Sequence, residues 1–135
     1  MLTEKDYCGY ETCVALKELG YVGSSRFFYA TKESPLRRYS YDQILTTRIA
    51  DAVGHTLAIS LYVAQKWLRE EKKIDVLIEL ETKDIHLSSK YYSIHISYMS
   101  RFRREFSYIS KNFNSYEEAL SEGIKEAVKI LKEEY

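Results

Sequence analysis

The sequence predicts an α+β protein, a two-layer sandwich in which a mainly antiparallel sheet of three or four strands has helices packed on one face. Three observations predict it. A helix runs directly into a strand over residues 60–80, a second strand alternates over residues 90–99, and an amphipathic helix follows residue 115. In chain order we expect helix, strand, loop, helix, three strands and helix. Each helix then buries its apolar stripe against the apolar face of the sheet.

The spacing of apolar residues changes half-way through residues 60–80. Leu61, Ala64 and Leu68 form the apolar stripe of a helix, and the charged run at residues 69–73 ends that helix. The period then becomes two, as in a strand with one apolar face. The residues of that face are Ile74, Val76, Ile78 and Leu80.

The first helix is expected over residues 8–19. Gly20 follows it at the position where a left-handed residue ends many helices. Tyr21 comes next and can contact Leu16, as this type of helix ending requires. The sequence therefore predicts a defined stop after the first helix.

The next part of the chain carries weaker signals. Residues 25–30 are expected to form a short strand, and residues 31–43 a loop that contains Pro35. Residues 44–58 stay ambiguous, because a few apolar residues can line a short helix before Gly54. These residues are Ile44, Leu45, Ile49 and Val53.

The C-terminal part begins with the alternating strand at residues 90–99. Residues 100–104 are expected to turn the chain into a third strand at residues 105–110. Ser115 and Glu118 then form the S-x-x-E capping box of the last helix. The apolar stripe of that helix is Tyr116, Leu120, Ile124, Ala127, Val128 and Leu131.

Composition limits the function. A chain of 135 residues fits a single domain over residues 1–135. The formal net charge is zero, so no global field favours nucleic acid or a membrane surface. The polar N-terminus and the absence of a long apolar run predict a cytoplasmic protein, and Cys8 and Cys13 are expected to be reduced thiols. Their spacing of five is expected to face them apart if both lie in or near the first helix.

The sequence lacks the common catalytic and nucleotide-binding motifs. It contains no phosphate-binding loop, dinucleotide fingerprint or nucleophile elbow. Asp84 and His86 are two residues apart in an expected turn region, a spacing that is common by chance. We therefore expect no enzyme activity, no cofactor and no metal site.

A candidate binding surface comes from the strand at residues 90–99 and the turn after it. The chain has 13 tyrosines, and aromatic rings with polar tips are frequent in interfaces. The candidate residues are Tyr91, His95, Tyr98, Arg101, Arg103 and Arg104. The alternatives are an ordinary solvated sheet face and a face covered by another subunit.

Arginines and aromatic rings interleaved between Lys90 and Lys111 also fit a single-stranded nucleic acid. The order of the last five elements is similar to that of double-stranded RNA-binding domains. That family has lysines at the start of the last helix, where this chain reads SYEEAL. A solvated basic hairpin is the alternative, and the sequence favours it.

Three segments carry a family resemblance: YETCVALKELGY at residues 10–21, AQKWLREEKKIDVLIEL at 64–80 and NSYEEALSEGIKEAVKIL at 114–131. They resemble short uncharacterised proteins of gut-bacterial genomes, often encoded in prophages or other mobile elements. The resemblance implies an accessory or regulatory role and no catalytic residues. We therefore expect a small non-enzymatic interaction module that self-associates or binds another protein. The alternative is a nucleic-acid-binding accessory protein that uses residues 90–111.

Overall fold

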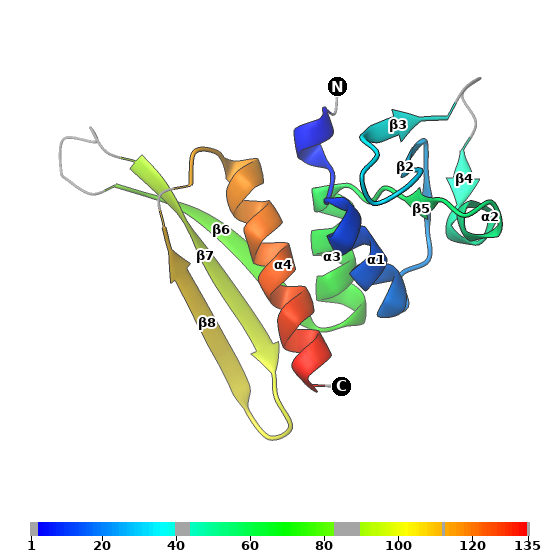
Figure 1. The fold of residues 1–135 in the computed structure, drawn as a ribbon. Helices are drawn as coiled ribbons and strands as arrows, with labels where there is room; N and C mark the ends of the chain where they lie inside the picture. Colours follow the sequence, from blue (N-terminus) through cyan, green and yellow to red (C-terminus); the bar gives the residue numbers. More distant parts are fainter. Residues whose placement is uncertain (1–2, 40–43, 83–89, 112, 135) are drawn as a thin grey trace. The chain divides into compact units, whose positions relative to one another are not determined.

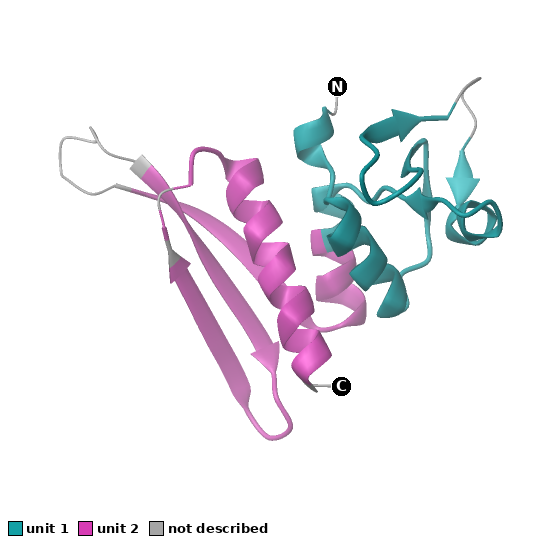
Figure 2. Ribbon diagram, viewed as in Figure 1, with its two compact units in different colours: residues 1–64 teal, residues 65–135 magenta. Residues whose placement is uncertain are grey.

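The computed structural model describes residues 3–39, 44–82, 90–111 and 113–134 (Figure 1). The chain divides into two compact units, residues 1–64 and 65–135, called unit 1 and unit 2 below (Figure 2). In the described residues, four α-helices and eight strands in three antiparallel sheets confirm the α+β class. The single domain over residues 1–135 stays a prediction.

Unit 1 consists of short elements. They are a 3₁₀ turn at Glu4–Asp6, α1 (Tyr10–Glu18), β1 (Ser24–Ser25), β2 (Phe27–Tyr29), β3 (Leu36–Arg38), β4 (Leu45–Thr46), α2 (Thr47–Ala52) and β5 (Thr56–Leu57). β1 pairs with β4, and β2 lies between β3 and β5. The next helix, α3 (Leu61–Glu71), begins in unit 1 and ends in unit 2.

The ending of α1 is the one that the sequence predicts. Gly20 has a φ of 107°, in the left-handed region that glycine adopts without strain. Its amide donates to the Lys17 carbonyl at 2.9 Å, and the Tyr21 amide donates to the Leu16 carbonyl at 3.0 Å. These two bonds satisfy carbonyls that the helix end would otherwise leave without partners.

Two expectations for residues 31–58 were wrong. The expected loop contains β3, whose Arg37 lies opposite Phe28 of β2. The expected apolar stripe of the short helix does not enter a core, because Ile44, Ile49 and Val53 are exposed. α2 is six residues long, and Thr47 and Ala50 are its buried residues. Residues 40–43 of the expected loop lie outside the described residues.

The core of unit 1 contains both cysteines, which are free thiols. Cys8 lies ahead of α1, which begins after Gly9, and the Cys13 thiol points back and donates to the Cys8 carbonyl at 3.6 Å. The two residues therefore converge, and the expectation that they face apart was wrong. The Tyr29 hydroxyl donates to the same carbonyl at 2.7 Å.

Unit 2 contains the main sheet, with β6 (Ile74–Thr82), β7 (Lys90–Met99) and β8 (Arg104–Ser110) in the antiparallel order β6-β7-β8. α4 (Tyr116–Glu134) lies along one face of this sheet (Figure 1). The sheet side chains under α4 include Val76, Ile94 and Ile96, all of them buried. The predicted strands at 90–99 and 105–110 are thus confirmed. Residues 83–89 of the expected turn region, with Asp84 and His86, lie outside the described residues.

A glycine in the middle of α4 allows this close packing. A methyl group built on Gly123 would lie 2.6 Å from Val76 Cγ1 and 3.0 Å from Ile94 Cγ2. Both atoms belong to buried β-branched side chains, which have little freedom to move away. The glycine therefore brings the helix backbone close to the sheet, a role that the sequence pattern did not indicate.

The N-terminus of α4 is capped by Ser115, whose hydroxyl accepts from the Glu118 amide at 3.1 Å. The second hydrogen bond of the capping box, which the Glu118 side chain accepts, differs from the prediction. The Glu118 carboxylate accepts from the Asn114 amide at 3.2 Å, one residue before the expected donor. Within the described part of the chain, no helix is long and apolar enough to cross a membrane.

Candidate functional site

The sheet of unit 2 has a second face, opposite the one that packs against α4. Strand alternation and the register of β6, β7 and β8 define this outer face. Its described residues are Asp75, Leu77, Glu79 and Glu81 of β6, Tyr91, Ser93, His95, Ser97 and Met99 of β7, and Arg104, Phe106 and Tyr108 of β8.

The outer face carries exposed apolar side chains. Leu77 is 45% exposed, Met99 53%, Phe106 75% and Tyr108 51%. Tyr108, Phe106 and Met99 are neighbours on β8 and the end of β7, since Phe106 lies opposite Ser97 and Met99 opposite Arg104, whereas His95 separates Leu77 from Tyr108. Single exposed apolar residues are ordinary, but a contiguous group on one face is typical of an interaction surface.

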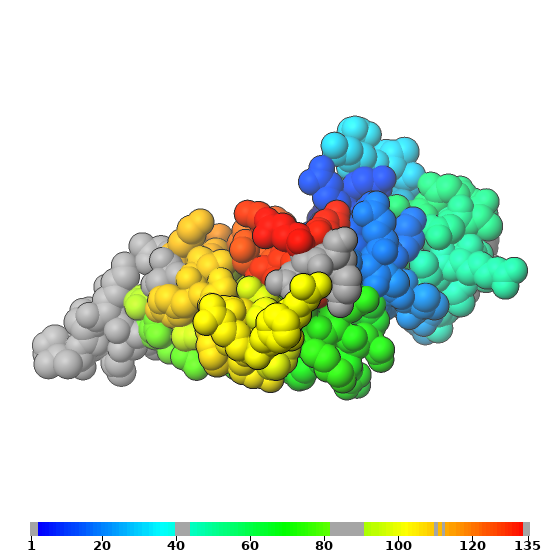
Figure 3. Space-filling model, turned by 90° about the horizontal axis from the view of Figure 1, so that it is seen from below, coloured from blue at the N-terminus to red at the C-terminus, as the bar shows by residue number. Residues whose placement is uncertain are grey.

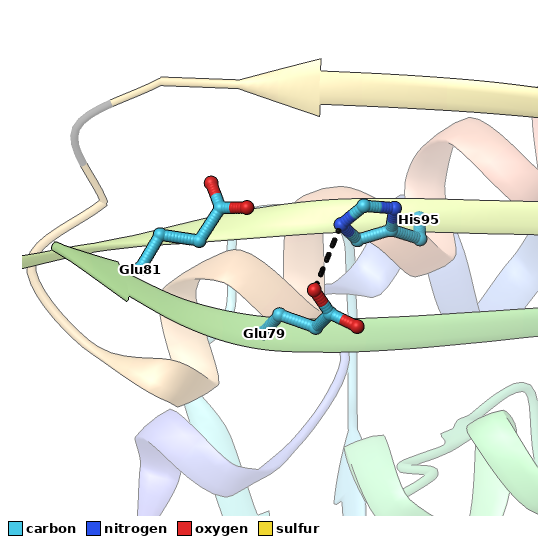
Figure 4. A group of neighbouring side chains, drawn as sticks. All are labelled: Glu79, Glu81 and His95. Atoms are coloured by element: carbon cyan, nitrogen blue, oxygen red, sulfur yellow. Dashed lines mark ion pairs between the residues drawn. The ribbon is translucent and has the colours of Figure 1, made fainter.

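A polar cluster extends from the middle of the face to the end at which β6 finishes. His95 Nε2 lies 3.4 Å from Glu79 Oε2 and 3.2 Å from Ser93 Oγ. The Tyr108 hydroxyl donates to Glu81 Oε2 at 3.1 Å, and the Tyr108 and His95 rings lie 4.8 Å apart. Figure 4 shows Glu79, Glu81 and His95 gathered on the same side of the sheet.

Hydrogen bonds keep Glu81 ionised. The Tyr91 hydroxyl is the largest cause that lowers the pKa of this carboxyl, and hydrogen bonds from Tyr108 and Ser93 and the charge of His95 lower it further. Partial desolvation acts in the opposite direction. Ser93 itself has no exposed surface. The lowered pKa keeps negative charge on Glu81 at neutral pH. We call Glu79 with Glu81 the acidic end.

The other end of the face is basic. The Arg104 guanidinium donates to Ser97 Oγ at 2.7 Å, and among the described residues no carboxylate lies within ion-pair distance of it. The turn before β8 adds Arg101, Phe102 and Arg103, all exposed, and this turn is yellow at the surface in Figure 3. Arg103 pairs with Glu105 at 2.7 Å. We call Arg104 with these turn arginines the basic end.

The six residues predicted from the sequence do not form one surface. Tyr91, His95 and Arg104 lie on the outer face, and Arg101 and Arg103 lie in the turn beside it. Tyr98 points to the opposite face, where it lies between Ile74 and Glu105. Alternation already separates Tyr98 from Tyr91 and His95, because its position differs from theirs by an odd number, 7 and 3.

Sequence reasoning missed the contribution of the other two strands. The apolar residues of β6 indicated its buried face, and the same alternation assigns Glu79 and Glu81 to the outer face. Tyr108 reaches His95 only because β8 pairs with β7 in this particular register. Register depends on the turn between strands, so it is not readable from composition.

Comparisons with protein-family models, with curated proteins and with solved structures found no match to this chain.

Proposed function

We propose that this protein is a small non-enzymatic interaction module that self-associates through the outer face of its main sheet. The observation that carries the proposal is the set of exposed apolar side chains Leu77, Met99, Phe106 and Tyr108 on that face. Its resemblance to proteins of prophages and mobile elements supports an accessory role. The cytoplasmic location expected from the sequence is compatible with its two free thiols.

The distribution of charge on the outer face indicates that its partner is a second copy of the chain. The acidic end and the basic end lie at opposite ends of the same strands, eight residues apart along β7. A two-fold axis that is parallel to the two faces and perpendicular to the line from Glu81 to Arg104 brings Arg104 of each copy over Glu81 of the other. The exposed apolar side chains of the two copies then lie within the same contact. One surface thus supplies both halves of the contact.

The size of the face predicts a weak dimer. Eight residues of strand span roughly 26 Å, and three strands are roughly 14 Å wide. The flat area is therefore on the order of 400 Å² for each copy, about half of what stable specific interfaces bury. The Phe102 side chain, 89% exposed at the end of the face, can add to it.

A charge exchange tests this arrangement. Arg104→Glu places acid over acid in a homodimer, and Glu81→Arg places base over base. In a mixture of the two variants, both contacts of the mixed dimer pair opposite charges. We expect each variant alone to associate more weakly than the wild type, and the mixture to recover association, as read by native mass spectrometry of isotope-labelled chains.

Lys125→Glu is the matched control, because Lys125 is an exposed residue of α4 and lies away from the face. Its self-association should equal that of the wild type. Failure of the mixture to form a mixed dimer, with both variants folded by circular dichroism, would refute the charge pairing.

A second candidate function is binding of single-stranded nucleic acid. Two exposed rings, Phe102 and Phe106, flank exposed arginines of the turn, the combination that stacks bases and contacts phosphates. The negative charge of the acidic end of the same face disfavours nucleic-acid binding, because it repels phosphate groups.

Fluorescence anisotropy with a single-stranded oligonucleotide tests this candidate function. Binding should weaken steeply with salt, and replacing Arg101, Arg103 and Arg104 with alanine should flatten that slope. No binding at low salt removes this candidate.

A further inference from the structure

We propose that Glu79, Glu81 and His95 form a binding site for a divalent transition-metal ion, with zinc as the representative ion. The inference goes beyond self-association and rests on a different observation, the convergence of three ligand atoms from two strands. One carboxylate oxygen of each glutamate and one ring nitrogen of His95 all lie within 4.8 Å of one another. Figure 4 shows the three side chains on the same side of the sheet.

The distances fit a metal coordination shell. Zinc binds imidazole nitrogen and carboxylate oxygen at about 2.0–2.2 Å, which places tetrahedral ligand atoms roughly 3.3–3.6 Å apart. Glu79 Oε2 and His95 Nε2 are already separated by 3.4 Å. Glu81 needs a shift of about 1 Å or more toward them, which a flexible glutamate side chain can make by changing its rotamer.

The charges favour a dication. With a neutral imidazole, the cluster holds two carboxylates and no full positive charge. The groups that surround it, Tyr91, Ser93 and Tyr108, are uncharged donors. On the same face, Asp75 is neutralised by Arg69 at 2.9 Å, and Arg104 lies at the other end. A divalent ion would bring the charge of the three-ligand cluster to zero.

Tyr108 contacts two of the ligands. Its hydroxyl donates to one oxygen of Glu81, and its ring lies against the His95 ring. Contacts of this kind orient ligands in metal sites, and losing one typically weakens affinity 10- to 100-fold. Ser93 Oγ lies 3.2 Å from His95 Nε2, the nitrogen that would bind the ion, so the ion would replace this contact.

The ligand set indicates the class of metal. One imidazole with two carboxylates suits zinc, manganese, iron(II) or cobalt, whereas calcium and magnesium prefer oxygen alone. The side chains of His95 and Glu79 are 37% and 59% exposed. The remaining coordination positions would therefore hold water. Binding requires His95 to be deprotonated, so affinity should fall at acidic pH.

The test is a titration of the full chain with zinc chloride against a chromophoric chelator at neutral pH. We expect one ion per chain. His95→Gln and Glu79→Gln should each weaken binding by more than tenfold, and Tyr108→Phe by roughly tenfold. A zinc-dependent shift of the His95 Nε2 signal in nitrogen NMR would place the ion on this ring.

Two controls make the result specific. Glu70→Gln and Glu122→Gln remove exposed carboxylates of the two helices and should leave affinity unchanged. Phe106→Glu, which should abolish self-association, should keep the zinc site, so the two proposals fail separately. No binding, or binding that survives both His95→Gln and Glu79→Gln, would overturn the site.

Discussion

At the scale of single residues, the Tyr29 hydroxyl holds the N-terminal segment to the core of unit 1. Its hydrogen bond to the Cys8 carbonyl is 2.7 Å long, and both residues are buried. Tyr29→Phe leaves that carbonyl without this donor and should lower the free energy of unfolding by about 1–3 kcal/mol. Urea denaturation at pH 7 measures this loss.

The same bond has a defined pH dependence. Burial is the largest cause that raises the pKa of Tyr29 above its usual value. The folded state therefore favours the protonated phenol. The contribution of Tyr29 to the free energy of unfolding is complete below the ordinary tyrosine pKa of about 10. It is lost as the pH rises toward the higher pKa that Tyr29 has in the folded state. The stability gap between wild type and Tyr29→Phe should narrow above pH 10, and a constant gap would contradict this account.

Gly123 gives a second prediction at this scale. Alanine raises helix propensity by about 1 kcal/mol, but its methyl group would overlap Val76 and Ile94, and overpacking costs about 1–3 kcal/mol. We expect Gly123→Ala to destabilise the protein by about 1 kcal/mol in urea denaturation. Glu122→Ala, at an exposed position of the same helix, should change stability by less than about 0.5 kcal/mol. A stabilised Gly123→Ala variant would mean that the helix does not lie this close to the sheet.

At the scale of elements, α4 supplies the core of unit 2. Leu120 and Ile124 have no exposed surface. Replacing either with alanine removes buried methyl groups and leaves a cavity, so each should lower stability by about 2–5 kcal/mol. Lys125→Ala, on the exposed side, should have little effect. An unchanged denaturation midpoint for Leu120→Ala would exclude this helix from the core.

The elements that were predictable are those with strong local signals. The Schellman ending at Gly20, the Ser115 cap and the alternation of residues 90–99 are all encoded within a few neighbouring residues. The strand predicted at residues 25–30 is confirmed by β2, but β3 and β5 were missed because they are three and two residues long and exist through pairing with β2. Pairing across distant segments leaves no periodic pattern in so short a stretch.

At the scale of the whole molecule, the difference between local signals and long-range pairing explains how much of the candidate site could be predicted. Alternation along β7 was sufficient to group Tyr91 with His95 and to separate both from Tyr98. The partners of His95 come from β6 and β8, at sequence distances of 16 residues for Glu79 and 13 for Tyr108. Sequence motifs for metal ligands have short fixed spacings, so they do not detect residues that lie this far apart in the sequence. The strand register was therefore needed to propose the metal site and the interaction face.

The central claim is that the outer face joins two copies of the chain. Sedimentation equilibrium of the wild type over a wide concentration range, with a chelator present, tests it most directly. We predict a mass that rises from 15.9 kDa toward twice that value as concentration increases. Phe106→Glu should stay monomeric throughout, because it replaces the most exposed apolar side chain of the three strands with a charge. A wild-type mass of 15.9 kDa at every concentration would contradict the account.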